Sequence, residues 1–143
     1  MAGNAPFTDI RRTGYTSQMR PLWPIEREVL KITAAEYPDS AETLRRQIDT
    51  AQVANFKNSG KGFFSYLAIT GDVPVLTETS PLSGAYGSVL GIEDSMGFIV
   101  FLKNGRISMI EGYCYGSGPT THIDFSRAVY GLTPYSPKPD AEA

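Results

Sequence analysis

The sequence predicts an α+β fold, with two N-terminal helices packed on one face of an antiparallel sheet that carries a C-terminal Asn-Gly hairpin. Apolar residues recur at helical spacing before residue 51, and the later segments resemble strands bounded by glycine, asparagine and proline. Asn104 and Gly105 lie between two apolar runs. Asn-Gly is the strongest short hairpin signal, because both residues tolerate positive φ. Helices followed by a meander of strands are typical of this class.

The first helix is expected to begin near Pro24, because proline suits the first helical turn, where its missing N–H costs nothing. Trp23, just before it, is expected to anchor the helix to the core. Apolar residues then follow at spacings of four and three, which gives the helix one short apolar face, formed by Ile25, Val29 and Ile32. Pro38 is expected to end the helix.

A second helix is expected to begin at Asp39 and to end near Thr50. Glu42 follows Asp39 by three residues, and this spacing predicts a capping box, in which each side chain accepts a hydrogen bond from the first turn. Leu44 and Ile48 are four residues apart, so they share one side of the helix and form its apolar stripe.

Strands are expected in residues 51–56, 62–70 and 85–92, and the clearest unit is the hairpin around Asn104-Gly105. Pairing outward from this turn sets three pairs of residues opposite each other, namely Leu102 and Ile107, Val100 and Met109, and Phe98 and Glu111. Because side chains alternate along a strand, these six are expected on one face. Gly97 then falls opposite Gly112, where the hairpin is expected to bend.

The folded part is expected to be one domain, residues 23–132. Residues 1–22 are polar, without a sustained period, and are expected to form an N-terminal arm. Residues 133–143 carry three prolines and no apolar cluster, which predicts a flexible tail. A chain of 143 residues, 41% hydrophobic and 20% charged, is long enough for a single core.

Charge and composition exclude several function classes. Thirteen Lys and Arg against fifteen Asp and Glu give a net charge of −2, which argues against a general nucleic-acid binder. The first fifteen residues contain no apolar segment typical of a secretory signal, and the longest apolar run, Phe98 to Leu102, is too short to span a membrane. A single cysteine cannot form an intramolecular disulfide. We therefore expect a cytoplasmic protein with a protein partner, and no membrane, nucleic acid or cofactor.

Three segments together resemble a family of small uncharacterised bacterial proteins. These segments are RPLWPIEREVL, with its Pro-Leu-x-Pro-x-Glu helix start, PDSAETLRRQI, with a Glu-x-Leu-Arg-x-Gln helix, and the hydrophobic hairpin GFIVFLKNGRISMIEGYCYG. The resemblance covers roughly residues 20–116. It implies the same α+β arrangement, and it implies no activity, because none is established for that family.

Cys114 is the one candidate nucleophile. Gly112-x-Cys114-x-Gly116 has the form of a nucleophile elbow with cysteine in place of serine, and His122 and Asp124 follow closely. This reading predicts a small thiol hydrolase or transferase. An elbow needs a helix directly after the turn, however, whereas the sequence continues with glycine, serine and proline, so we favour a small packed cysteine. His122 is the only histidine, and no spacing around it indicates a metal site.

The candidate binding residues lie at the end of the second hairpin strand. Glu111 stands among apolar residues, with Tyr113 and Tyr115 after it, while Glu93 and Asp94 lie on the loop before the hairpin. The carboxylate is costly on an apolar face unless it is hydrogen-bonded or near the rim. It either bonds the bent backbone or an arginine such as Arg20 or Arg27, or it belongs to a contact surface with the tyrosines. We favour the structural role, because paired carboxylates also stabilise bends and helix ends. The absence of a catalytic set favours a non-enzymatic binding module, for example an immunity-type, antitoxin-type or accessory protein.

Overall fold

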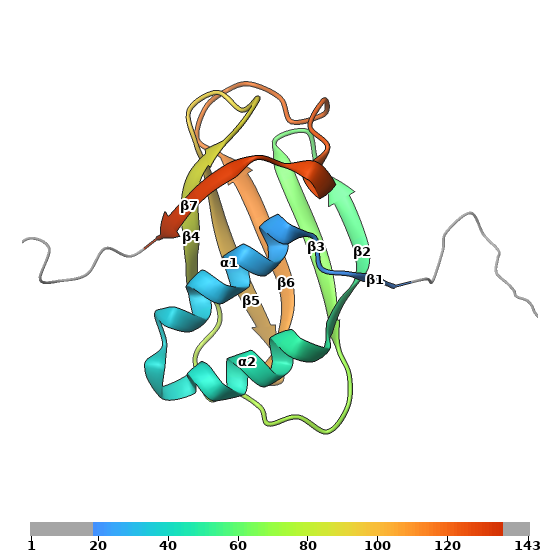
Figure 1. Cartoon of the computed structure of the whole chain (residues 1–143), viewed down its shortest axis with the longest axis vertical. Helices are drawn as coiled ribbons and strands as arrows, with labels where there is room; N and C mark the ends of the chain where they lie inside the picture. Colours follow the sequence, from blue (N-terminus) through green and yellow to red (C-terminus); the bar gives the residue numbers. More distant parts are fainter. Residues whose placement is uncertain (1–18, 136–143) are drawn as a thin grey trace, which may run out of the picture.

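The structure is a computed structural model that describes residues 19–135, and it confirms the α+β class (Figure 1). The helices are α1 (Pro24–Ala35) and α2 (Ala41–Thr50), with short 3-10 turns η1 (Pro38–Ser40) and η2 (Phe125–Arg127). The strands are β1 (Arg20–Pro21), β2 (Ala51–Asn58), β3 (Gly62–Ile69), β4 (Leu82–Val89), β5 (Met96–Lys103), β6 (Arg106–Cys114) and β7 (Tyr130–Pro134).

The strands described form one sheet of seven strands in the order β1-β2-β3-β6-β5-β4-β7, and every neighbouring pair is antiparallel. Strand β6 is therefore the middle strand, with β3 on one side and its hairpin partner β5 on the other. In Figure 1 both helices lie on the viewer's side of the sheet. We call that side the inner face and the opposite side the outer face.

The core fills the space between the helices and the inner face. The side chains that form it alternate along each strand and recur every three to four residues along α1, as period two and period 3.6 require. Aromatic rings dominate its centre, where Phe63 contacts Phe125 at 4.7 Å and Phe98 at 6.0 Å between ring centroids. Fully buried members include Ile25, Val29, Leu30, Leu44, Phe63, Phe98, Ile110 and Phe125.

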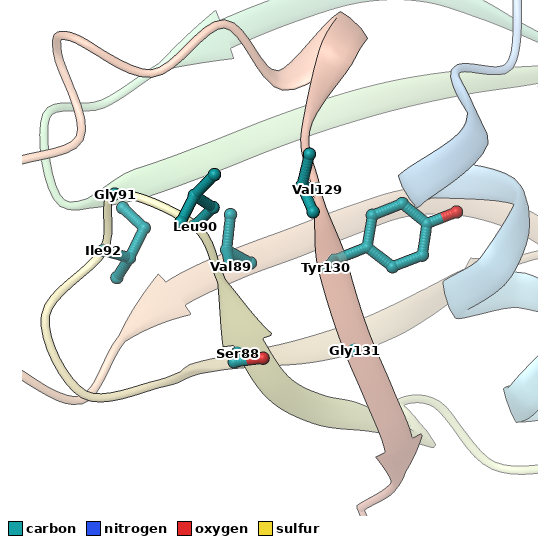
Figure 2. A pocket seen from close by; sticks show the side chains of 8 residues that line it. All are labelled: Ser88, Val89, Leu90, Gly91, Ile92, Val129, Tyr130 and Gly131. Atoms are coloured by element: carbon teal, nitrogen blue, oxygen red, sulfur yellow. The ribbon is translucent and has the colours of Figure 1, made fainter.

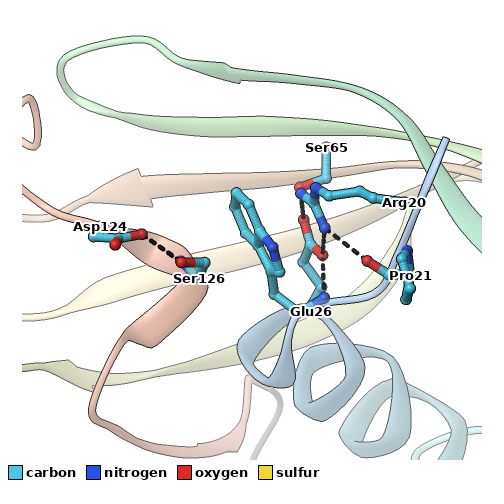
Figure 3. A network of polar contacts seen from close by, with 7 residues as sticks. Arg20, Pro21, Glu26, Ser65, Asp124 and Ser126 are labelled. Carbon is cyan, nitrogen blue, oxygen red and sulfur yellow. Dashed lines mark hydrogen bonds and ion pairs between the residues drawn. The ribbon is translucent and has the colours of Figure 1, made fainter. Parts of the chain in front are cut away.

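The start of α1 is held by a buried ion pair (Figure 3). The Glu26 side chain is inaccessible to solvent, and its two oxygens accept hydrogen bonds from Arg20 Nη1 at 2.9 Å and Nη2 at 2.8 Å. The backbone N–H of Trp23 donates to Glu26 Oε1 at 2.7 Å, and Ser65 Oγ donates to Oε2 at 2.5 Å. The Arg20 guanidinium also lies 3.3 Å from the centroid of a Trp23 ring. One carboxylate thus ties β1, α1 and β3 together.

The second helix begins later than the sequence pattern predicts. Residues Pro38 to Ser40 form a 3-10 turn, and α2 starts at Ala41 with Ser40 as its N-cap, so the capping box expected at Asp39 is wrong. Glu42 instead pairs with Arg45 on the solvent side of the helix. The helix is connected to the sheet by Gln47, which is fully buried. Its amide donates to the Gly105 carbonyl at 3.0 Å and accepts from the Ile107 N–H at 2.9 Å.

The hairpin forms at the expected turn, but its register changes after the first pairs. Asn104 and Gly105 both have positive φ, at 53° and 76°, and Leu102 pairs with Ile107 as expected. Beyond that pair the register shifts, because Ser108 is an extra residue in β6 and forms a β-bulge. Its hydroxyl donates to the Phe101 carbonyl at 3.1 Å.

The bulge corrects the expected faces. Val100 pairs with Ile110 rather than Met109, and Phe98 pairs with Gly112 rather than Glu111. Glu111 is opposite Ile99 and shares the outer face with Met109, whereas Ile107 points into the core. A shift of one residue moves every later side chain of a strand to the other face. The expectation of six side chains on one face is therefore wrong from Met109 onward.

Both ends of the sheet extend beyond the expected domain of residues 23–132. Arg20 and Pro21, expected in the arm, pair with Val53 and Gln52 of β2. At the other end β7 pairs with β4 as far as Pro134, and the Tyr135 N–H donates to the Gly84 carbonyl at 3.1 Å. The expected tail therefore begins inside β7. The remainder of the arm, residues 1–18, and of the tail, residues 136–143, lies outside the described residues.

Candidate functional site on the outer face

The outer face of the sheet carries a group of partly exposed apolar side chains around one carboxylate. Strand register places them there, and no helix or strand of residues 19–135 packs over them. Each is half-buried or exposed, in contrast to the buried residues that alternate with it. The six side chains around Glu111, which we call the outer-face patch, are Phe64, Tyr66, Ile99, Phe101, Met109 and Tyr113.

Glu111 occupies the centre of this patch. It lies on the middle strand, directly opposite Phe64 of β3 and Ile99 of β5, and it is half-buried. Directly opposite residues in antiparallel strands have Cβ atoms only about 5 Å apart, so both apolar side chains flank the carboxylate. Within residues 19–135 the carboxylate makes no hydrogen bond and no ion pair.

The structural explanation for Glu111 therefore finds no support in the described contacts. Arg20, one of the two expected partners, is bound to Glu26. Arg27, the other, is on α1, on the inner side of the sheet. Gly97 is opposite Tyr113 rather than Gly112, and the Tyr113 ring covers it so closely that an added Cβ would lie 2.4 Å from Tyr113 Cζ. The Tyr113 ring, and not the Glu111 carboxylate, therefore packs against the backbone at Gly97, where the hairpin was expected to bend.

Tyrosines extend the outer-face patch toward the loop end of the sheet. Tyr113 and Tyr115 meet edge to face at 5.5 Å between ring centroids, and Tyr86 and Tyr135 meet in the same way at 6.3 Å. A shallow pocket of about 310 Å³ lies among these rings, and the residues that line it are Tyr86, Ser95, Tyr115 and Tyr135. We call it the tyrosine pocket. It joins residues from β4, the β4–β5 loop, the end of β6 and the end of β7.

Tyr113 connects the patch to the tyrosine pocket. Burial raises the pKa of its hydroxyl above the usual value near 10, and contacts with the hydroxyls of Tyr115 and Tyr135 raise that pKa further. The hydroxyl therefore remains protonated at neutral pH and can donate a hydrogen bond to a neighbouring oxygen. Sequence reasoning found Tyr113 and Tyr115 but missed Tyr86 and Tyr135. They are far away along the chain, and only the β5–β4–β7 pairing brings them close.

Glu93 and Asp94, two of the candidate binding residues, lie beside the exit of β6. Both are exposed on the β4–β5 loop, and Asp94 has a positive φ of 64°. A Cβ added at Gly116 would lie 2.9 Å from the Glu93 carbonyl oxygen, so only glycine fits this approach of the two loops. Ser95, next to them, accepts a hydrogen bond from the Tyr115 N–H at 2.9 Å. The loop thus brings two carboxylates to the edge of the tyrosine pocket.

Cys114 lies at the end of β6 in a setting that does not activate a thiol. Burial raises the pKa of the thiol, and the nearby Lys61 opposes this only in part. The residues after Cys114 form bends and turns, and the first helical residues after it are those of η2, beginning at Phe125. The strand–turn–helix geometry of a nucleophile elbow is therefore not formed.

His122 and Asp124 have other partners. The His122 Nε2 atom lies 3.2 Å from the Gly91 carbonyl oxygen, on the exposed side of the loop. Asp124 caps η2, where it accepts hydrogen bonds from the Ser126 N–H at 3.1 Å and from Ser126 Oγ at 2.6 Å. These bonds lower the pKa of the Asp124 carboxyl. No hydrogen bond within residues 19–135 joins either side chain to Cys114.

A second hollow, of about 460 Å³, lies where β4 ends and β7 begins (Figure 2). Leu90 and Val129 border it, with 73% and 64% of their surfaces exposed, and the Leu90 N–H donates to the Val129 carbonyl at 2.8 Å. Its lining is mostly apolar and carries no ionisable side chain apart from Tyr130. In the described part of the chain no three His, Cys, Asp or Glu side chains are arranged to hold a metal ion.

Comparison of the chain with protein-family models, with curated proteins and with solved structures found no match. Neither α1 nor α2, the two α-helices described, has the length and apolar character that crossing a membrane requires.

Proposed function

We propose that this protein is a non-enzymatic binding module that contacts a protein partner through the outer-face patch and the tyrosine pocket. An immunity-type, antitoxin-type or accessory protein is the kind of module that we have in mind. The observation that carries the proposal is the uncovered outer face, where six aromatic and aliphatic side chains surround a carboxylate without a partner in the described chain.

Physical chemistry favours a protein surface at this place. Sheet faces that remain in water usually carry polar side chains, whereas this one carries aromatic and aliphatic residues on three adjacent strands. Contiguous exposed apolar surface in a folded protein marks an interaction site more often than chance. Tyrosine is also enriched at the centres of protein interfaces, because its ring buries a large area while its hydroxyl still finds a hydrogen-bond partner.

The shape of the tyrosine pocket agrees with a contact surface. It is shallow, and its walls come from four separate parts of the fold, which present rings in different orientations. Cys114, the only thiol of the chain, is not among the residues that line it, and burial raises the pKa of that thiol. The contacts of His122 and Asp124 likewise give no support to a thiol hydrolase or transferase.

The proposal is tested by measuring the affinity of outer-face variants for a captured partner. Reading frames beside the gene supply the first partners to express, together with proteins captured from the native host. Tyr115→Ala removes a ring that is half exposed, so we expect affinity to fall at least about tenfold, as at interface hot spots, without a change in melting temperature. Val129→Ala, at a position of the second hollow that is more exposed still, should bind normally. Equal affinities for both variants would place the contact elsewhere.

A further inference from the structure

The unpartnered carboxylate at the centre of the outer-face patch indicates what kind of side chain the partner brings to it. Glu111 is the only acidic residue among the rows of side chains that β3, β6 and β5 present on this face. Its neighbours across the strands, Phe64 and Ile99, are apolar, and so is Met109 two residues before it. A carboxylate in such surroundings is costly to cover, unless the group that covers it carries a positive charge.

We propose that the protein partner presents an arginine side chain to Glu111. This inference rests on the proposed binding function and specifies the chemistry of the partner. The guanidinium would pair with the Glu111 carboxylate, while its flat faces would stack on the neighbouring Phe64 and Tyr113 rings. Arginine combines both properties, because its planar group bonds carboxylates in a bidentate manner and stacks on aromatic rings.

The same combination already occurs inside the molecule. Arg20 bonds both oxygens of Glu26 and at the same time lies over the Trp23 ring at 3.3 Å. Glu26 has its cation, whereas Glu111 has an aromatic neighbour and no cation within the described residues. The outer face thus carries the carboxylate and the aromatic ring of that arrangement, and the partner would supply the guanidinium.

The exposed carboxylates beside the tyrosine pocket favour a basic group at that end of the patch. Glu93 and Asp94 are exposed beside the tyrosine pocket, and the chain as a whole has a net charge of −2. Lys57 is the nearest basic residue along the row of Glu111. It faces Phe64, one strand further away, so two strand spacings, or about 10 Å, separate its backbone from that of Glu111. No ion pair joins the two.

The covering group could instead come from a second copy of this chain, or the patch could bind apolar groups only. Both alternatives are outcomes of one experiment. A random peptide library displayed on phage is panned against the full-length protein, and peptides that lose binding to Tyr115→Ala are kept, because they bind at the outer face. Each arginine in a kept peptide is then replaced by citrulline, which has nearly the same shape but no charge.

We expect the kept peptides to contain an arginine whose replacement by citrulline lowers affinity for the wild-type protein about tenfold or more, as charged interface pairs do. Glu111→Gln should lower the affinity of the arginine peptide by a similar factor. Because this variant has no carboxylate to pair with, the arginine and citrulline peptides should bind it with nearly the same affinity. Glu111→Asp keeps the charge and should retain part of the affinity. Glu42→Gln, an exposed carboxylate on the solvent side of α2, is the matched control and should bind normally.

Three results would overturn the proposal. If citrulline peptides bind the wild-type protein as well as arginine peptides, the face binds proteins without an arginine, and the proposed function survives alone. If no peptide loses binding to Tyr115→Ala, the proposed function fails as well. If sedimentation shows a dimer that Glu111→Lys dissociates, the occupant is a second copy of the chain. Melting temperatures of all variants confirm that each one is folded.

Discussion

Two glutamates at the residue scale show how the same side chain can serve stability or recognition. Glu26 is fully buried, and four hydrogen bonds from Arg20, Trp23 and Ser65 satisfy its oxygens. Glu111 is half-buried and has no such bonds in the described chain. The carboxylate that the sequence pattern marks only as part of a helix start, Glu26, is the structural one. The carboxylate that the pattern singles out, Glu111, is the one that we propose meets a partner.

The Arg20–Glu26 pair gives the first prediction. Arg20→Met keeps most of the aliphatic length but leaves the Glu26 carboxylate buried without its cation. Removing one partner of a buried pair is strongly destabilising, so we expect the free energy of unfolding to fall by about 3 kcal/mol. Urea denaturation measures this change. Arg45→Met, which breaks exposed pairs with Glu42 and Asp49, is the control and should leave the denaturation midpoint unchanged.

Cys114 gives a second prediction at this scale, one that also tests the thiol-enzyme alternative. Because burial raises the pKa of the thiol, the folded protein has a smaller fraction of thiolate at pH 7 than an exposed cysteine has. Labelling by a disulfide reagent should therefore be slower in the native protein than in urea, and its rate should go on rising with pH beyond the point at which the rate in urea levels off. Cys114→Ser should remain folded and bind normally. Rapid labelling at pH 7 would instead indicate an activated nucleophile.

At the scale of elements, the turn of the β5–β6 hairpin was predictable and its register was not. The Asn-Gly pair determines the turn locally, and the structure has both residues at positive φ. The bulge at Ser108 depends on packing of the whole sheet, because it brings Ile110 into the core beside β3 and turns Glu111 outward. No local pattern in the sequence marks an extra residue, so the face of Glu111 could not be derived from spacing alone.

The turn itself supplies a prediction. Gly105→Val strains a β-branched residue at a φ of 76°, and its Cβ would lie 2.8 Å from both the Leu76 carbonyl oxygen and Val75 Cβ. We expect a loss of about 1–3 kcal/mol in the free energy of unfolding, seen as a lower melting temperature. Asn104→Gly accepts the same positive φ and is the matched control. If the Gly105→Val protein has the melting temperature of the wild type, the assignment of a positive φ to residue 105 in this turn is wrong.

At the scale of the whole molecule, the sheet has one covered face and one uncovered face. Amphipathic helices before residue 51 and a strand meander after it were enough to predict the covered face, because apolar stripes on helices must be buried against a partner layer. The uncovered face could be predicted only in part. Glu111, Tyr113 and Tyr115 are neighbours along one strand. Tyr86 and Tyr135 join them through long-range pairing that no spacing in the sequence reveals.

The chain end provides the last prediction, because it distinguishes the sequence pattern from the structure. The pattern predicts that deleting residues 134–143 leaves the fold intact, because this segment has little to bury. The structure gives Pro134 a place opposite Ala85 in the sheet, and it gives Tyr135 a backbone bond to Gly84 and a ring contact with Tyr86. Deleting residues 134–143 should therefore lower the free energy of unfolding by about 1–2 kcal/mol, the sum of one hydrogen bond and one ring contact.

Partner affinity should fall as well, because this deletion removes one wall of the tyrosine pocket. Deleting only residues 136–143 keeps every contact described here and is the matched control, with the melting temperature and affinity of the full chain. Tyr135→Ala in the full chain separates the two effects, since it retains the backbone bond to Gly84 and loses only the ring. We expect that variant to bind weakly while it melts close to the wild type. If instead both deletions behave alike, β7 ends before Pro134 and the pocket is formed by the remaining tyrosines.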